Sequence, residues 1–151
     1  MAPFTKTLEL RWSDVDQNGH VRHSIYSDLG AEARIAWLSA GGFPWQRFVS
    51  LGLGPVLLRE ELEFRREISL GDRVTVDVRA AGLSPDGARW KLAHDLTRSD
   101  GTLAARITVH GGWLDHTSRR LVPPPPELLA IFDHTDRASD FEELASLERR
   151  K

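Results

Sequence analysis

The feature that most constrains the fold of this 151-residue chain is a long stretch, residues 56–109, in which apolar and polar side chains alternate. Turn signals at Gly71-Asp72, Ser84-Pro85-Asp86-Gly87 and Ser99-Asp100-Gly101 divide it into four segments. Alternation with a period of two places the apolar side chains on one face of a strand, and short turns join antiparallel neighbours. The stretch therefore predicts a four-stranded antiparallel meander with one buried face.

Two further elements precede the meander. Residues 5–12 alternate, with Leu8, Leu10 and Trp12 on one face, which predicts a half-buried strand. Residues 24–40 carry apolar side chains at helical spacing, with Ser24 as the expected N-cap and Gly41-Gly42 as the stop. One strand, one helix and four more strands predict an α+β fold in which the helix covers an antiparallel sheet.

The remaining segments are assigned by composition. Residues 43–54 predict a loop or a short helix that could cover a pocket. The four prolines of residues 123–126 end the sheet, and residues 127–132 predict one or two helical turns. Residues 1–133 are expected to form one domain, and residues 134–151 a charged C-terminal tail or a loosely docked helix.

Composition excludes several classes of function. The chain has no cysteine and a formal net charge of −2, so neither a disulfide framework, a thiolate zinc site nor wholesale nucleic-acid binding is expected. No apolar run approaches the ~18 residues of a membrane span, and the first ten residues lack the apolar core of a signal peptide. We therefore expect a soluble, cytoplasmic protein without a nucleic-acid or membrane partner.

The chemistry is expected where the first strand leads into the helix. Asp14 and Asp16 stand one residue apart, and the turn dipeptide Asn18-Gly19 follows. The start of a helix offers free N–H donors and a positive dipole end, so it can stabilise negative charge that develops on a bound group. From the residues alone, capping a helix or holding the turn is the favoured role of both carboxylates, and catalysis is the alternative. His20 and His23 have no third ligand nearby in sequence, so no metal is expected.

The order of strand, Asp-x-Asp-x-x-Gly-His-Val, Tyr26, long helix and four strands resembles the hotdog-fold acyl-CoA thioesterases of the 4-hydroxybenzoyl-CoA thioesterase type. The resemblance covers residues 5–132. It implies a long central helix wrapped by a five-stranded antiparallel sheet. It also implies a homodimer whose sheets join edge to edge, with the active sites at the interface and a dimer of dimers left open.

The same resemblance implies roles for individual residues. It maps the catalytic carboxylate onto Asp16 and the donor to the thioester carbonyl onto the backbone N–H of about His23, with Gly19 and Tyr26 as candidate substrate-binding residues. Asp16 would attack directly or activate a water molecule, while Asp14 is expected to hold the turn. Arg22-His23 stand where many relatives have Asn-Asn.

The expected substrate is an acyl-CoA, with coenzyme A as part of the substrate and no separate cofactor. Hydrolysis on an acyl-carrier protein and acyl-thioester binding without turnover are the alternatives. Arg65-Arg66 and Arg119-Arg120 could hold phosphates, but paired arginines are usually solvated, so no phosphate-binding residue is assigned. Four aromatic residues could line an acyl pocket or belong to an ordinary core: Trp37, Phe43, Trp45 and Phe48.

Overall fold

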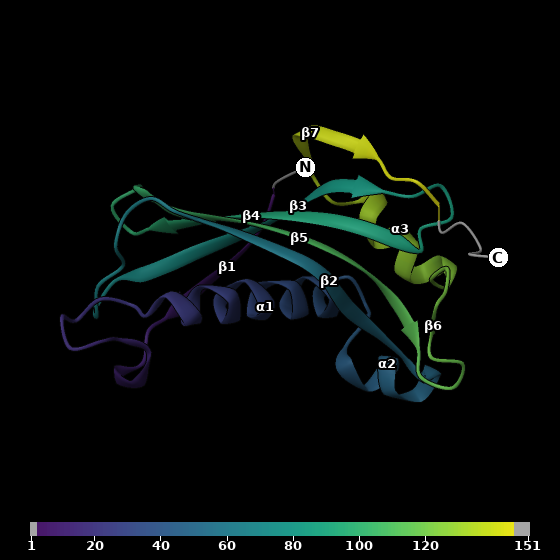
Figure 1. Ribbon diagram of the computed structural model, residues 1–151, viewed down its shortest axis with the longest axis horizontal. Helices are drawn as coiled ribbons and strands as arrows, with labels where there is room; N and C mark the ends of the chain where they lie inside the picture. The colour runs from purple at the N-terminus through teal and green to yellow at the C-terminus, as the bar shows by residue number, and fades with distance from the viewer. Residues whose placement is uncertain (1–2, 147–151) are drawn as a thin grey trace.

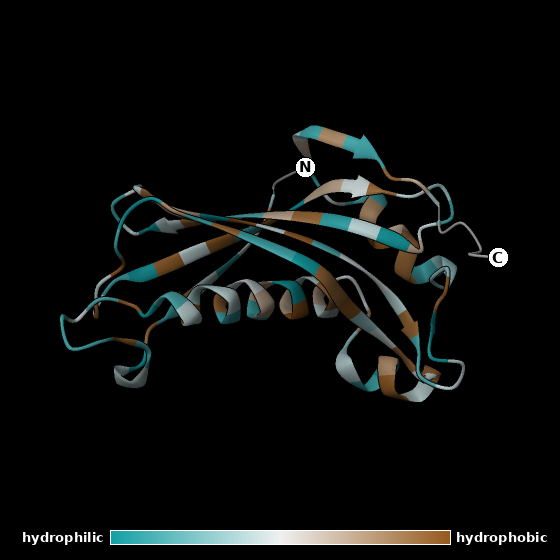
Figure 2. Cartoon of the chain, viewed as in Figure 1, coloured by the Kyte–Doolittle hydropathy of each residue, from teal (hydrophilic) through white to brown (hydrophobic). Residues whose placement is uncertain are grey.

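The computed structural model describes residues 3–146. Five long strands pair antiparallel in the order β1-β3-β4-β5-β2. This confirms the predicted first strand and a meander of β3, β4 and β5. The predicted pairing across Gly71-Asp72 was wrong, because β2 crosses to the far edge of the sheet and pairs with β5. Their bounds are β1 (Phe4–Glu9), β2 (Leu53–Phe64), β3 (Arg73–Leu83), β4 (Arg89–Arg98) and β5 (Leu103–Asp115). Apolar and polar residues alternate along them (Figure 2), as one buried face requires.

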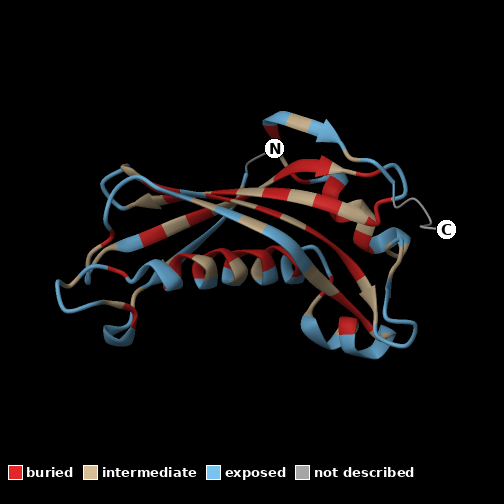
Figure 3. Ribbon diagram, in the orientation of Figure 1, coloured by how far each residue is buried: buried red, intermediate tan, exposed pale blue. Residues whose placement is uncertain are grey.

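The long helix α1 (His23–Ala40) lies along the concave face of the curved sheet (Figure 1). Its buried residues face the sheet and its exposed residues point away from it (Figure 3), because a surface helix packs one apolar stripe against the core. The predicted helix is thereby confirmed. The short helix α2 (Trp45–Leu51) follows, as residues 43–54 allowed, and α3 (Pro126–Asp133) provides the predicted helical turns.

Aromatic rings fill the core at the end of the sheet near α2 and α3. Phe48 and Trp113 stack with ring centroids 6.1 Å apart, and Trp37 meets Phe132 edge to face at 5.2 Å. Trp37, Phe43 and Phe48 are therefore buried, whereas Trp45 is exposed.

The predicted start of the structure needs two corrections. Trp12 does not end the first strand on its buried face, because the strand stops at Glu9 and Trp12 lies 81% exposed in the 3-10 helix η1 (Trp12–Asp14). Nor is Ser24 the N-cap of α1. The helix begins at His23, and its N-cap is Arg22, two residues before Ser24; the Arg22 side chain makes no capping bond.

The predicted C-terminal tail or loosely docked helix was wrong for residues 137–143, which form the strand β7 (Arg137–Glu143) parallel to β3. The physical reason is an open edge. The strand β1 pairs with β3 only as far as Val78, and β7 takes the next part of that edge, between Ala80 and Leu83. A two-residue strand, β6 (Arg120–Leu121), pairs with β5. Residues 147–151 of the predicted tail lie outside the described part.

No helix in the part of the chain that the structure describes has the length and apolar character needed to cross a membrane.

Candidate active site

Residues 15–22 form a loop between η1 and α1 that backbone hydrogen bonds hold in place. The Asp16 N–H donates to the His20 carbonyl at 2.8 Å, and the Gly19 N–H donates to the Asp16 carbonyl at 3.0 Å. Gly19 has φ +75°, a left-handed conformation that glycine adopts without steric cost. The Gly19 carbonyl accepts from the N–H of Leu70 at 3.0 Å, which ties the loop to the segment after β2.

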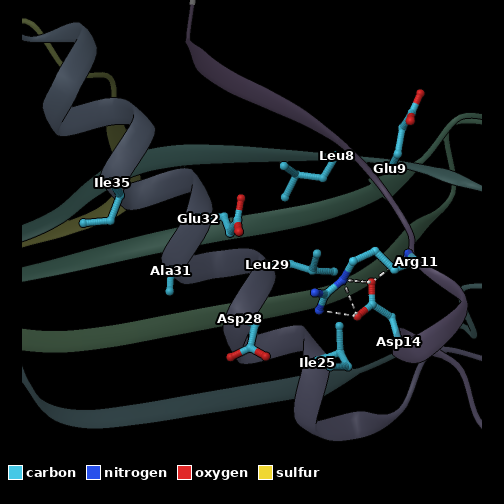
Figure 4. Close-up of a pocket in the computed structure, with 10 residues that line it drawn as sticks. All are labelled: Leu8, Glu9, Arg11, Asp14, Ile25, Asp28, Leu29, Ala31, Glu32 and Ile35. Atoms are coloured by element: carbon cyan, nitrogen blue, oxygen red, sulfur yellow. Dashed lines mark hydrogen bonds and ion pairs between the residues drawn. The ribbon is translucent and has the colours of Figure 1, made fainter. Parts of the chain in front are cut away.

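Asp14 holds the start of this loop, as the sequence predicts. The residue is only 4% exposed, and its carboxylate accepts from the Arg11 backbone N–H at 2.8 Å and from Arg11 Nη2 at 2.9 Å (Figure 4). The hydrogen bond from the Arg11 side chain is the main cause that lowers the pKa of the Asp14 carboxyl. Asp14 is therefore a charged, fully engaged group with a structural task.

Asp16 differs from Asp14 in both exposure and partners. The residue is exposed, and its Oδ1 accepts from the N–H of Asn18 at 2.8 Å and from the N–H of His20 at 3.2 Å. Its Oδ2 has no hydrogen-bond partner among residues 3–146. One oxygen thus fixes the carboxylate to its own turn, while the other stays open to solvent or a ligand.

The start of α1 lies at the end of the same loop. No side chain caps the helix, so the N–H groups of its first turn, including those of His23 and Ser24, have no intrahelical partner. Arg22 Nη2 donates to the Ser13 carbonyl at 2.9 Å, which turns this side chain back toward η1. His23 and Ser24 are both exposed. The loop therefore contains an exposed carboxylate and an exposed, positively polarised helix end.

Tyr26 lies one turn into α1 and is buried. Its ring meets Phe64 of β2 edge to face, with centroids 5.0 Å apart, and burial raises the pKa of its hydroxyl. The structure thus places Gly19 in the loop and Tyr26 in the core beneath the helix start. Substrate binding by either residue stays a prediction.

A hollow of about 620 Å³ opens between β1, η1 and α1 (Figure 4). Asp14 and Arg11 lie at one end of it, and Ala31 and Ile35 line it further along α1. Its lining combines apolar side chains with three more carboxylates, those of Glu9, Asp28 and Glu32. The hollow follows the helix away from the loop.

Sequence reasoning missed a buried polar pair under the middle of α1. Arg34 Nη1 lies 3.1 Å from His94 Nε2, and His94 Nδ1 lies 2.7 Å from the Asp77 carbonyl oxygen. A carbonyl can only accept and a guanidinium can only donate, so the proton of a neutral His94 sits on Nδ1. Burial, with the nearby Arg34 charge, lowers the pKa of His94 to about 3.

The sequence carried part of this signal. His94 shares a strand face with Trp90, Leu92 and Leu96, so the alternation of the strand places it on the apolar face. Its partner Arg34 stands 60 positions away, and no local spacing links the two residues.

The arginine pairs gain no phosphate-binding role from their positions. Arg65, Arg66, Arg119 and Arg120 are exposed, and Arg65 pairs with Glu63 at 3.2 Å. Within residues 3–146, no group of three or more histidine or carboxylate side chains is arranged to hold a metal ion.

Comparison with known proteins gives a family. The model of the thioesterase-like superfamily matches residues 10–132. A relative from Aquifex aeolicus (strain VF5), named "Putative esterase", is 30% identical over 82 residues, which make up 54% of this chain and 64% of the relative. The chain thus matches less than two thirds of the length of that relative.

Solved structures confirm the predicted hotdog fold. A hypothetical protein from Staphylococcus aureus, characterised in complex with CoA, has a TM-score of 0.81 at 22% identity, covering 99% of this chain and 90% of its own. A 1,4-dihydroxy-2-naphthoyl-CoA thioesterase from Synechocystis has a TM-score of 0.78 at 21% identity, covering 87% of this chain and 96% of its own. At these identities the likeness concerns the fold.

Proposed function

We propose that this chain, which belongs to the thioesterase-like superfamily, hydrolyses an acyl-CoA thioester to the free acid and coenzyme A. The observation that carries the proposal is the Asp16 carboxylate, exposed and held by one oxygen in the loop that leads to the uncapped start of α1. The similar fold of a protein characterised in complex with CoA supports the choice of carrier.

The chemistry requires a nucleophile or base on one side of the thioester carbonyl and stabilisation of the oxyanion on the other. In the proposed reaction, Asp16 either attacks the carbonyl carbon or takes a proton from an attacking water molecule. Attack by Asp16 expels the coenzyme A thiolate and gives a mixed anhydride that water then opens. In both routes the C–S bond breaks, the thiolate is protonated, and the His23 N–H donates to the oxyanion. Neither route needs a metal.

We further propose that the active form is a homodimer joined through β2. This strand lies at one end of the sheet order, so one row of its backbone N–H and C=O groups is free to pair with another strand. It also exposes Leu57, Leu58 and Phe64, of which the last two are 55% exposed. A second copy that pairs its own β2 antiparallel would satisfy the backbone and cover these side chains.

The catalytic proposal is tested by thiol release from short, long and aromatic acyl-CoAs. We expect Asp16→Ala to lower kcat/KM on the best substrate by at least ~100-fold, since it removes the reacting group. Asp133→Ala removes another exposed aspartate, at the far end of α3, and should retain wild-type rates. Equal rates for wild type and Asp16→Ala on every substrate would refute the role of Asp16.

The same assay separates the alternatives. If the protein hydrolyses acyl groups only when they are attached to an acyl-carrier protein, that protein and not coenzyme A is the carrier of the substrate. Tight acyl-CoA binding without thiol release from any substrate would mean a binding protein.

The dimer is tested by sedimentation at decreasing protein concentration, with activity measured in parallel. We expect activity to fall as the dimer dissociates, and a fully active monomer would contradict this.

A further inference from the structure

A second, smaller cavity lies between α1 and the strands β2, β4 and β5. Its volume is about 130 Å³, and nine of its ten lining residues are apolar or aromatic. The tenth is Arg34. A charged side chain in such a lining calls for an explanation, because a buried charge without a partner is costly.

The Arg34 guanidinium is nearly unpaired. The residue is 9% exposed, and its single hydrogen-bond partner within residues 3–146 is the neutral His94. No carboxylate oxygen of the described chain lies within 4.0 Å of it. The charge of Glu60 on β2 acts on it from a greater distance, while Glu60 Oε1 accepts from Ser27 Oγ at 2.7 Å. A guanidinium has five N–H donors, so most of them remain available.

The same cavity holds a second unused donor. Three tryptophans line it, and two have their indole N–H satisfied: Trp37 donates to Thr135 Oγ1 at 3.0 Å, and Trp113 donates to the Gly87 carbonyl at 3.1 Å. The third, Trp90, is 2% exposed, and its Nε1 is buried without a partner among the residues described. Buried indole N–H groups usually find an acceptor.

Resting on the proposed function, we infer that this cavity binds the free carboxylate end of a dicarboxylic acyl group, with Arg34 and Trp90 as its donors. The polar side chains that line the cavity can only donate hydrogen bonds, so the group of a ligand that binds there must accept them. A negative charge on that group would also compensate the charge of Arg34. A planar guanidinium matches a carboxylate with two parallel hydrogen bonds. The volume is close to the ~150 Å³ that accommodates a benzene-sized guest.

The distance along α1 from His23 to Arg34 sets the length of the acyl group. Arg34 follows His23 by 34 − 23 = 11 residues on α1, which is about 16 Å along the helix axis. The larger hollow begins beside Asp14, and it shares two lining residues of α1, Ala31 and Ile35, with this cavity. In the inferred binding mode, a long acyl chain follows α1 from the helix start, passes Ala31 and Ile35, and ends at Arg34. The substrate class is a long-chain dicarboxylic acyl-CoA.

The test compares acyl-CoAs that end in a carboxylate with neutral analogues of equal length, from short to long chains. For wild type we expect kcat/KM to favour the carboxylate by at least ~10-fold for long chains. Arg34→Met should bring this ratio to about one or below, Arg34→Lys should keep part of it because the charge remains, and Trp90→Phe should lower it severalfold. Arg73→Met removes an exposed arginine paired with Glu9 at 3.2 Å and should keep the wild-type ratio.

The ratio separates recognition from folding, because a purely structural loss lowers the rates for both substrates equally. No preference at any chain length, or an unchanged ratio in Arg34→Lys and Trp90→Phe, would overturn the inference even if Arg34→Met failed to fold. Calorimetry of the binding of both acyl-CoAs to Asp16→Ala tests the carboxylate site separately from the proposed hydrolysis. Tighter binding of the dicarboxylic acyl-CoA without turnover by wild type would retain the carboxylate site and refute the hydrolase.

Discussion

The Asp16 loop before α1 and the Arg34–His94 pair under its middle differ in how their polar side chains are held. At its start, Asp16 is exposed and held by backbone N–H groups of its own turn. At its middle, Arg34 and His94 are buried and depend on partners from distant strands. An exposed polar group costs little to place, so it is free to react, whereas a buried polar pair is tied to the stability of the fold.

The largest expected effect on stability concerns the buried pair. His94→Leu removes the acceptor of the Arg34 N–H and leaves a buried charge without a partner, so it should lower the free energy of unfolding by about 3 kcal/mol. Urea denaturation measures this. His110→Leu, on the neighbouring strand β5 and only half-buried, should cost less than about 0.5 kcal/mol. Equal losses in both variants would contradict the contrast between the buried and the half-buried histidine.

The same pair should make stability depend on pH. The pKa of His94 is about 3 in the folded chain against 6.5 ordinarily, so the unfolded chain binds the proton first. Its contribution is complete above pH 6.5 and is lost as the pH falls toward 3. We expect a loss of about 2 kcal/mol between pH 7.5 and pH 5. His94→Asn should lack this loss, and parallel pH profiles of the two proteins would refute the assignment.

A smaller loss of stability is expected at Asp14, the last residue of η1. Asp14→Ala removes the acceptor of the Arg11 backbone N–H and should cost about 1 kcal/mol, the usual value of such a cap. The ion pair adds little because the Arg11 side chain is 75% exposed. The folded pKa of Asp14 is lowered, so this contribution is present above its ordinary pKa and lost in acid. A cost that persists unchanged in acid would speak against it.

The smallest effect on stability is expected at Asp16, and it gives the clearest contrast with the buried Arg34–His94 pair. Asp16→Ala should change the free energy of unfolding by less than about 1 kcal/mol, because an exposed Asp16 exchanges its two hydrogen bonds for water. The same variant is expected to lose its hydrolytic activity. Thermal unfolding and thiol release on one preparation test both statements. A large loss of stability would reassign Asp16 to the same structural task as Asp14.

Features that depend on residues close together in the sequence could be predicted, whereas contacts between distant residues could not. The strands, α1 and the turn at Gly19 depend on spacing within a few residues, so periodicity and turn chemistry identify them. Ser24 was wrong as the N-cap by two residues, because the backbone geometry of the loop and not the residue type sets where α1 begins. Arg34–His94 and the pairing of β7 with β3 could not be predicted, since each joins residues that only the folded sheet brings together.

The two borders of the sheet are unequal. On one side β2 offers 12 consecutive residues. On the other, β1 and β7 share the border of β3 as two short pieces that run in opposite directions. A sheet with two equivalent borders would accept copies on both sides and grow into a fibre, whereas here only the β2 border is long enough for an extended self-complementary contact. Growth through β2 would therefore stop at two chains, which protects the protein from polymerising through the contact proposed to make it active.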